Sequence, residues 1–277
     1  MINMKKQFLL SMFLAGFVCA QAPPEPFKFG DVTVTGSLRT RLYGWDWFQP
    51  AAGNNSYFYS GDILRVNFSE KLRGWDWDAE LAVPFLLGMP TNSTVAAPQG
   101  ALGLGANYFS ANHNNQYSGM IFAKQLYARL KAFGGSESSS LQVGRFEFND
   151  ATELTPKNTT LAALKRDRIS QRLIGTFGFS DVGRSFDGVH YDFSKPTDDF
   201  TFVSAVPTRG VYQTDGWGWN RIAFGYAAYT HDWGHGNHAA DTRFFAIDYD
   251  DFRHILKTDN RPTAVRKGDT ENIHIQT

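Results

Sequence analysis

The sequence has 277 residues, which is enough for one large domain. Its 27 Lys and Arg residues balance 27 Asp and Glu residues, so charge gives no reason to expect a nucleic-acid partner. A mean hydropathy of −0.34 argues against a helical membrane protein.

Residues 1–22 form a predicted secretory signal peptide. Lys5 and Lys6 precede an apolar run from Phe8 to Cys19, and Ala20-Gln21-Ala22 matches a cleavage site. The apolar run is too short to span a bilayer as a helix. A lipoprotein with its lipid on Cys19 is an alternative, which the preceding residue disfavours. Because this is the only cysteine, the mature chain 23–277 has no disulfide or thiolate ligand.

The following segments alternate polar and apolar residues with a period of two, which is typical of β-strands. In 31–43, for example, Val32, Val34, Leu38 and Leu42 share one face. Several segments exceed ten residues, whereas soluble strands average about five or six and tilted transmembrane strands need about 9–11. The predicted strands lie at about 31–43, 63–69, 75–85, 119–132, 139–148, 185–194, 199–206, 221–233 and 242–249.

The connections between these strands alternate between long and short. Long ones are predicted at about 44–60, 87–118, 149–184 and 207–220, and short ones at about 73–74, 134–137, 195–198 and 234–241. Outer-membrane barrels have this asymmetry. We therefore predict an all-β fold, a transmembrane antiparallel up-and-down β-barrel, of which the chain supplies about 9–10 strands. The expected location is the cell outer membrane, with outer-membrane lipid around the barrel.

Six of the seven tryptophans lie in three Gly-Trp-x-Trp motifs at 44–47, 74–77 and 216–219. Paired aromatic residues at strand ends favour a girdle at the membrane interface. However, Trp45 and Trp47 share the strand face of Arg39 and Arg41, and the 216–219 pair also misses the apolar face. The alternatives are bulges that reverse these rings, or positions in the lumen or loops, where indole rings suit sugar C–H surfaces.

The last part of the chain does not complete the pattern. Residues 251–271 are polar, and Ile273-His274-Ile275 begins a further strand. Bacterial single-chain barrels have an even number of strands. We therefore expect the N-terminal part of a larger barrel, unless a short tenth strand closes a small one.

Charged residues in the strands are expected to face a polar lumen. Rings of Arg or Lys set anion selectivity in pores, so these residues are candidates for a solute path. In the alternative interpretation, they pair with one another and brace the wall. Lys124, Arg145 and Glu147 share parity with apolar neighbours and would need a bulge or a rim position. The inward-facing set is Arg39, Arg41, Arg65, Arg129 and Lys131, with Asp76, Asp78 and Glu80.

Thr159–Ile174 has helical spacing and is strongly basic. In a long outer loop, this segment either folds inward and narrows the pore with positive charge, or remains a solvated helix near anionic lipopolysaccharide. His231, His235 and His238, with Asp232 and Asp241, suggest a metal site only weakly. No catalytic motif is present, so we expect neither an enzyme nor a cofactor.

Six stretches in order resemble the alginate export family of outer-membrane porins. They are GSLRTRLYGWDWF (36–48), YSGDILRVNFSEKL (59–72), APQGALGLGANYF (97–109), GRFEFND-x-TELTPKNTTLAALKRDRISQRLIG (144–175), VGRSFDGVHYDF (182–193) and PTRGVYQTDGW (207–217).

The resemblance implies a monomeric barrel of about eighteen strands, of which this chain supplies about half. It further implies passage of an anionic oligo- or polysaccharide through an arginine-lined pore, and periplasmic export partners. The implied pore-lining residues are Arg39, Arg41, Arg65, Arg129, Arg145, Arg166, Arg168, Arg172 and Arg184, with Asp187 as a lumen partner.

Three functions follow from these expectations. The first is a passive, charge-selective channel for anionic sugars or polyuronate. The second is a non-conducting structural or adhesion barrel of the outer membrane. The third, a soluble periplasmic β-domain that binds or cleaves polysaccharide, is disfavoured by strand length and loop alternation.

Overall fold

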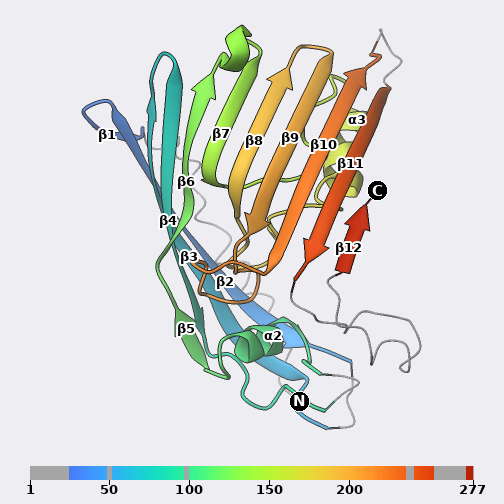
Figure 1. Ribbon diagram of the computed structural model, residues 1–277. Helices are drawn as coiled ribbons and strands as arrows, with labels where there is room; N and C mark the ends of the chain where they lie inside the picture. The colour runs from blue at the N-terminus through green and yellow to red at the C-terminus, as the bar shows by residue number, and fades with distance from the viewer. Residues whose placement is uncertain (1–24, 49–51, 97–99, 235–239, 253–272, 277) are drawn as a thin grey trace.

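The computed structural model describes residues 25–48, 52–96, 100–234, 240–252 and 273–276 (Figure 1). The predicted signal peptide lies outside these residues. The strands are β1 (Phe27–Phe29), β2 (Val32–Asp46), β3 (Ser56–Lys71), β4 (Trp75–Leu87), β5 (Tyr117–Gly119), β6 (Phe122–Lys131), β7 (Ser139–Phe146), β8 (Phe186–Ser194), β9 (Asp198–Pro207), β10 (Ile222–Asp232), β11 (Asp241–Asp251) and β12 (Ile273–Gln276). The helical elements are α2 (Leu104–Ala111), η2 (Phe133–Gly135), α3 (Thr159–Leu164) and η3 (Lys165–Ile169).

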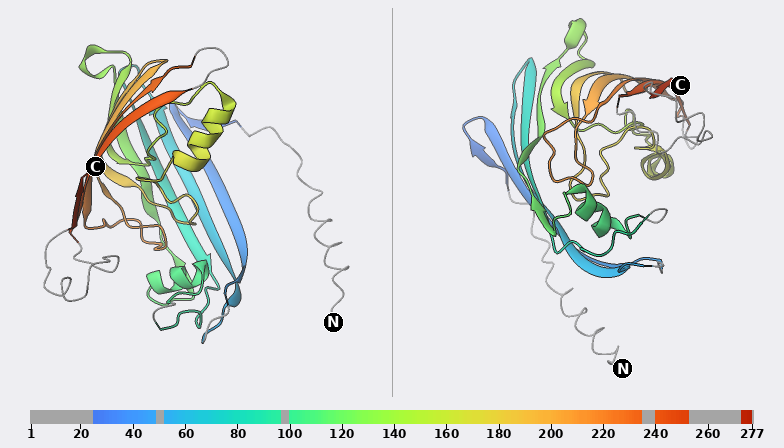
Figure 2. Two further views of the ribbon diagram at one scale, coloured as in Figure 1. Left: turned by 90° about the vertical axis from the view of Figure 1, so that its right-hand side faces the viewer. Right: turned by 60° about the horizontal axis from the view of Figure 1, so that its bottom comes forward.

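All strands belong to one twelve-stranded antiparallel sheet. Neighbours follow chain order from β1 to β12, except that β5 pairs only with the end of β4. The nine predicted strands are confirmed, although β3 extends well beyond 63–69, and the up-and-down order is confirmed. The sheet curls into an arc that stays open between β1 and β12 within the described residues (Figure 2). Closure into a cylinder is therefore not observed.

The predicted asymmetry of the connections is confirmed for three of the four long ones, whereas the predicted connection 44–60 is shortened to 47–55 because β2 and β3 extend into it. Residues 47–55, 88–121, 147–185 and 208–221 join strands at one end of the sheet, which we call the long-loop rim. Residues 72–74, 132–138, 195–197 and 233–240 join them at the opposite end, the short-turn rim. Two of the long connections carry α2 and α3, which lie inside the arc (Figure 2).

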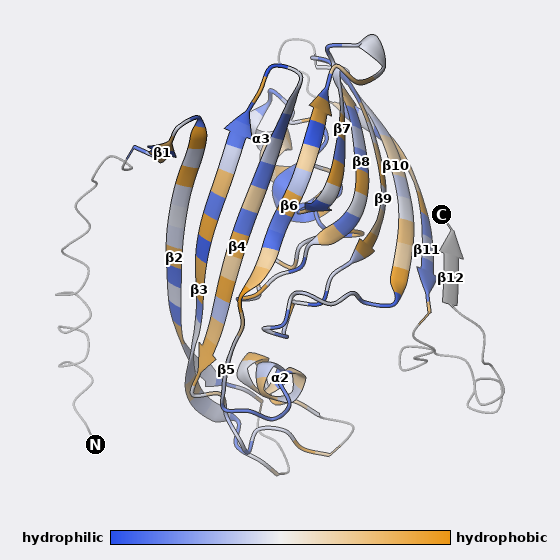
Figure 3. Ribbon diagram, turned by 60° about the vertical axis from the view of Figure 1, so that its left-hand side comes forward, coloured by the Kyte–Doolittle hydropathy of each residue, from blue (hydrophilic) through white to orange (hydrophobic). Residues whose placement is uncertain are grey.

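The convex face of the sheet carries a continuous band of exposed apolar side chains. Cross-strand register places them on one face, as in the pairs Leu38 with Leu64 and Ala128 with Val143. Figure 3 shows the resulting alternation of hydrophobic and hydrophilic residues along β2, β3, β4 and β6. Each of these residues is between 38% and 68% exposed, so no second layer covers them. We call this set the apolar belt: Leu38, Leu64, Leu81, Leu126, Leu130, Val143, Phe200, Phe202, Tyr229 and Phe244.

The core lies on the concave side. Inward residues of β7 to β10, including Phe146, Phe186 and Tyr226, bury themselves against Phe148 and Ile174 from the 147–185 connection. The sheet thus uses a loop of its own chain, rather than a second sheet, to cover part of its inner face.

One of the predicted parity failures is a β-bulge. The register between β4 and β6 shifts between Glu80 and Leu81, which places Lys124 on the concave side although Leu126 faces outward. Lys124 is fully buried there, while Leu126 is 58% exposed.

The tryptophan pairs occupy three different environments. Trp75, 41% exposed, lies on the convex face near the short-turn rim, as a girdle requires. The β2–β3 register is unbroken, so Trp45 lies on the concave face, where it packs against a tyrosine cluster. Trp217 and Trp219 lie in the 208–221 connection. The girdle interpretation is therefore wrong for Trp45. Trp217 and Trp219 are exposed at the long-loop rim, and for them it stays a prediction.

Candidate functional site: a charged concave face crossed by a loop

The 147–185 connection between β7 and β8 crosses the concave face, and we call it the strap. Its helix begins after Asn158, whose side chain accepts hydrogen bonds from the amides of Thr160 and Leu161. The helical structure ends at Ile169, not at Ile174 as predicted. The amides of Leu173 and Ile174 donate instead to the carboxylate of Asp150, so they are not available to continue a helix.

One part of the strap is anchored to β10 and β11. The ammonium of Lys165 is buried and donates to Asp241 at 3.0 Å and to the carbonyl of Leu154 at 2.8 Å. The guanidinium of Arg243 lies 3.4 Å from Glu153 and 3.7 Å from Asp150. Burial raises the pKa of Asp150. The hydrogen bonds from the strap amides and the charge of Arg243 act in the opposite direction and reduce this rise.

A second part of the strap packs across β3, β4 and β6. Val182 is buried against the inward side chains of Ile63, Ala82 and Phe122. Beside this cluster, the ammonium of Lys124 donates to the carbonyl of Arg184 at 3.1 Å and pairs with Glu147 at 3.4 Å. Since a buried ammonium needs several acceptors, Lys124 fixes the end of the strap to the wall.

The strap then reaches β2 through Asp181, which is fully buried. The Oδ1 atom of Asp181 accepts from the hydroxyl of Tyr43 at 2.9 Å and lies 3.4 Å from Arg39 and 3.6 Å from Arg41. The backbone amide of Asp181 donates to the hydroxyl of Tyr108 on α2 at 2.7 Å. The strap therefore connects β2 with β11 across the arc.

Two of the predicted lumen arginines pair with carboxylates of the wall and, for Arg65, of the strap. Arg129 makes a bidentate pair with Asp76, at 3.0 and 2.7 Å. Arg65 lies 3.3 Å from Glu80 and 3.7 Å from Glu147. These contacts support the bracing interpretation for Arg65 and Arg129, although their side chains remain 30% and 41% exposed.

Arg145 and Asp187 lie elsewhere. They form a bidentate pair with two 2.7 Å contacts, but their register partners place them on the convex rows, beside Leu126. There, at the long-loop rim, Trp219 donates to Asp187 and Arg145 lies over the ring of Trp217. Their predicted lumen position therefore does not match the register.

The remaining predicted arginines belong to the strap. Arg166 is 72% exposed and pairs with the adjacent Asp167, while Arg172 donates to the backbone carbonyls of Asp167 and Arg168. Arg168 is also exposed. Arg184 lies over the ring of Phe177 at 4.7 Å. The strap lies on the concave side with Lys165 buried, as inward folding requires (Figure 2), whereas the three following arginines are exposed, as in the solvated interpretation. Narrowing of a pore by their charge stays a prediction.

The sequence did not point to Asp181, Tyr43 or Tyr108. Burial and the nearby Asp181 carboxylate raise the pKa of Tyr108. For Tyr43, the only available signal was parity, because it shares the face of Arg39 and Arg41. Tyr108 lies on α2, where strand parity does not apply. Nothing in the sequence near Asp181 indicates which strand it reaches.

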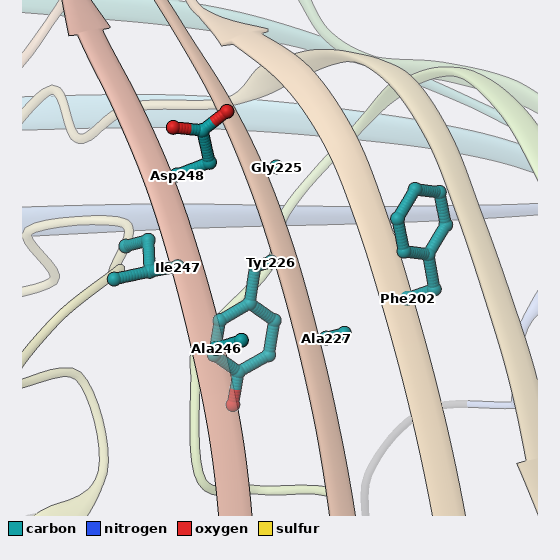
Figure 4. A pocket seen from close by; sticks show the side chains of 7 residues that line it. All are labelled: Phe202, Gly225, Tyr226, Ala227, Ala246, Ile247 and Asp248. Carbon is teal, nitrogen blue, oxygen red and sulfur yellow. The ribbon is translucent and has the colours of Figure 1, made fainter. Parts of the chain in front are cut away.

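A hollow of about 570 Å³ lies on the outer side of β9, β10 and β11 (Figure 4). Gly225, Ala227 and Ala246 line it because their side chains are small, with Phe202 and Asp248 at its edges. Most of its lining is apolar and continues the apolar belt, so it lies apart from the charged concave face.

Within the described ranges, no group of three or more potential metal ligands is found. His235 and His238 lie outside those ranges, and His231 contacts Asp198 at 2.7 Å. No helix in the described part of the chain is both long and apolar enough to span a membrane. No protein-family model matches the chain, and no curated protein matches it. The resemblance to alginate export porins therefore remains an expectation.

Proposed function

We propose that this chain contributes to an outer-membrane channel that selects anionic sugars or polyuronates by charge. The observation that carries the proposal is the apolar belt. A soluble protein rarely leaves a continuous apolar surface uncovered, whereas the outer face of a membrane barrel requires one. The opposite face of the same strands carries arginines and carboxylates, as expected of a lumen.

Aromatic residues near the short-turn rim support the same orientation. Trp75, Phe133 and Trp233 are exposed close to the turns there, while Phe200 and Phe244 lie at the adjacent edge of the belt. Aromatic rings at this level match a membrane interface. The proposal also requires strands beyond those described, because a sheet edge cannot remain unpaired in hydrocarbon.

Charge selection would occur where the strap narrows the lumen. Arg166, Arg168 and Arg172 are exposed on the strap, and Asp167 is the one acidic residue between them. Cations fixed in a confined path favour anions.

Reversal potentials across planar bilayers under a salt gradient test this proposal. Wild type is expected to prefer anions, and Arg166→Gln/Arg168→Gln/Arg172→Gln to lose much of that preference. Lys71→Gln/Arg73→Gln/Lys195→Gln, at the short-turn rim, removes the same three charges and is the control for a change in net charge. Cation preference in wild type, or equal selectivity in all variants, would refute it.

A second candidate is a non-conducting structural or adhesion barrel. It is favoured by the strap itself, which is fixed to both β2 and β11 and fills part of the concave side. Membrane insertion without measurable conductance, in wild type and after release of the strap, would support this candidate.

A further inference from the structure

The environment of Asp181 is a site built for a carboxylate. Arg39, Arg41 and Tyr43 follow one another at alternate positions on the concave face of β2, and all three contact Oδ1. Gly61, the register partner of Arg41, forms the floor, because a Cβ there would collide with Oδ2 of Asp181. We call Arg39, Arg41, Tyr43 and Gly61 the socket.

Asp181 fills this socket poorly. Arg65, Arg209 and Arg243 also lie 3.3–3.7 Å from their carboxylates. Arg129 and Arg145, however, make short bidentate pairs, with contacts of 3.0 and 2.7 Å for Arg129 and 2.7 Å twice for Arg145. By contrast, the two guanidinium groups of the socket lie 3.4 and 3.6 Å from a single oxygen of Asp181. Strong pairs of this kind have donor–acceptor distances of about 2.7–2.9 Å.

The second carboxylate oxygen of Asp181 is left without a hydrogen bond. Oδ2 is buried and has no donor within the described part of the chain, and Nε of Arg39 is likewise buried without an acceptor. Unused hydrogen-bonding capacity on both partners means that a better-placed carboxylate would gain interactions here.

The socket is also accessible from the concave side. The side chains of Arg39 and Arg41 are 35% and 37% exposed, although Asp181 is fully buried beneath them. With Asp181 in place, the two guanidinium groups retain one net positive charge. A solute carboxylate can therefore approach the arginines before Asp181 leaves.

We propose that the socket is a binding subsite for the carboxylate of an acidic sugar, and that Asp181 occupies it as an internal substitute when no solute is bound. Binding of a solute carboxylate displaces Asp181 and detaches the strap from β2. The inference rests on the proposed function for its ligand class, since a uronate is the solute that carries a carboxylate on each sugar unit.

Calorimetric titration of the full chain in detergent micelles with trigalacturonate tests this inference. Asp181→Ala vacates the socket and is expected to bind trigalacturonate about tenfold more tightly than wild type, the scale of one hydrogen bond to a charged group. Asp181→Ala/Arg39→Gln/Arg41→Gln is expected to lose that gain. A neutral galactose trisaccharide is expected not to discriminate between these proteins.

Two further variants separate the socket from general loosening of the strap. Lys165→Met removes the anchor at Asp241 and leaves the socket intact, so trigalacturonate affinity should stay at the wild-type level. Asp181→Asn keeps the shape of the side chain and removes its charge. It replaces Asp181→Ala in the titration if the alanine variant does not fold. Its affinity should also rise.

Equal affinity in wild type and in the folded Asp181 variants would overturn the inference, as would a gain that persists without both arginines. The titration needs no conducting pore. A channel that fails to select anions would therefore refute the proposed function but would not test carboxylate binding at the socket. Likewise, a failed titration would refute the socket but not the channel.

Discussion

Replacing Leu38 by arginine distinguishes a lipid-facing belt from an ordinary soluble surface. Leu38 is 64% exposed near the middle of β2 and lies opposite Leu64, which is also exposed. On a soluble protein, an exposed substitution usually changes the free energy of unfolding by no more than about 0.5 kcal/mol. At the midplane of a bilayer, an arginine on the lipid face costs about 2–4 kcal/mol.

The cost in the bilayer corresponds to a roughly 30- to 700-fold change in the folding equilibrium, because each 1.4 kcal/mol is about a factor of ten. Urea unfolding in lipid vesicles, followed by tryptophan fluorescence, measures it directly. Thr35→Arg is the matched control, because Thr35 is exposed on the concave face of the same strand and should accept a charge with little loss. A cost below about 0.5 kcal/mol for Leu38→Arg would refute the membrane interpretation of the belt.

Three further predictions concern the charged face and the strap. Arg129→Gln should lower the free energy of unfolding by about 1–2 kcal/mol in the same assay, because the buried Asp76 then pairs with Lys131 alone. The side chain of Arg129 is 41% exposed, so solvent screening keeps the loss small. Asn158→Ala removes the helix cap and should cost about 1 kcal/mol, seen as roughly fivefold faster hydrogen exchange of the α3 amides. Asp150→Asn tests the pH dependence of stability. Burial raises the pKa of Asp150 above its ordinary value of 3.8. The free energy of unfolding of wild type, relative to the variant, should therefore be greatest below pH 3.8 and decline as pH rises through the native pKa. A difference that stays constant from about pH 3 to pH 7 would contradict this assignment.

The period-two pattern was sufficient to predict the nine long strands and their order, but not the three-residue β1 and β5. It succeeded because side chains on neighbouring strands share a face over long, unbroken registers, as along β2 and β3. It failed where the register shifts, and the bulge beside Lys124 has no local sequence signal. The predicted helix over 159–174 failed at its end for a related reason, because Asp150, distant in sequence, captures the amides that the helix needs.

The candidate site was only partly predictable. The arginines of β2 could be placed on the inner face from parity alone, but their partner Asp181 belongs to a connection 142 residues away from Arg39. Such contacts depend on how a long loop packs against the sheet. The local alternation of polar and apolar residues does not determine that packing. The tryptophan motifs were uninformative for the opposite reason, since similar Gly-Trp-x-Trp sequences occupy the convex wall, a concave-facing strand end and a rim loop.

The central claim, that the convex face contacts hydrocarbon and the concave face contacts water, can be tested position by position. The predicted mature chain has no cysteine, so single spin labels can be placed at belt positions such as Leu126 and Val143 and at concave positions such as Thr35 and Gln142. In lipid bilayers, electron paramagnetic resonance should find the belt labels accessible to oxygen, and the concave labels accessible to a water-soluble nickel complex. Belt labels that the nickel complex reaches as readily as the concave ones would contradict the account.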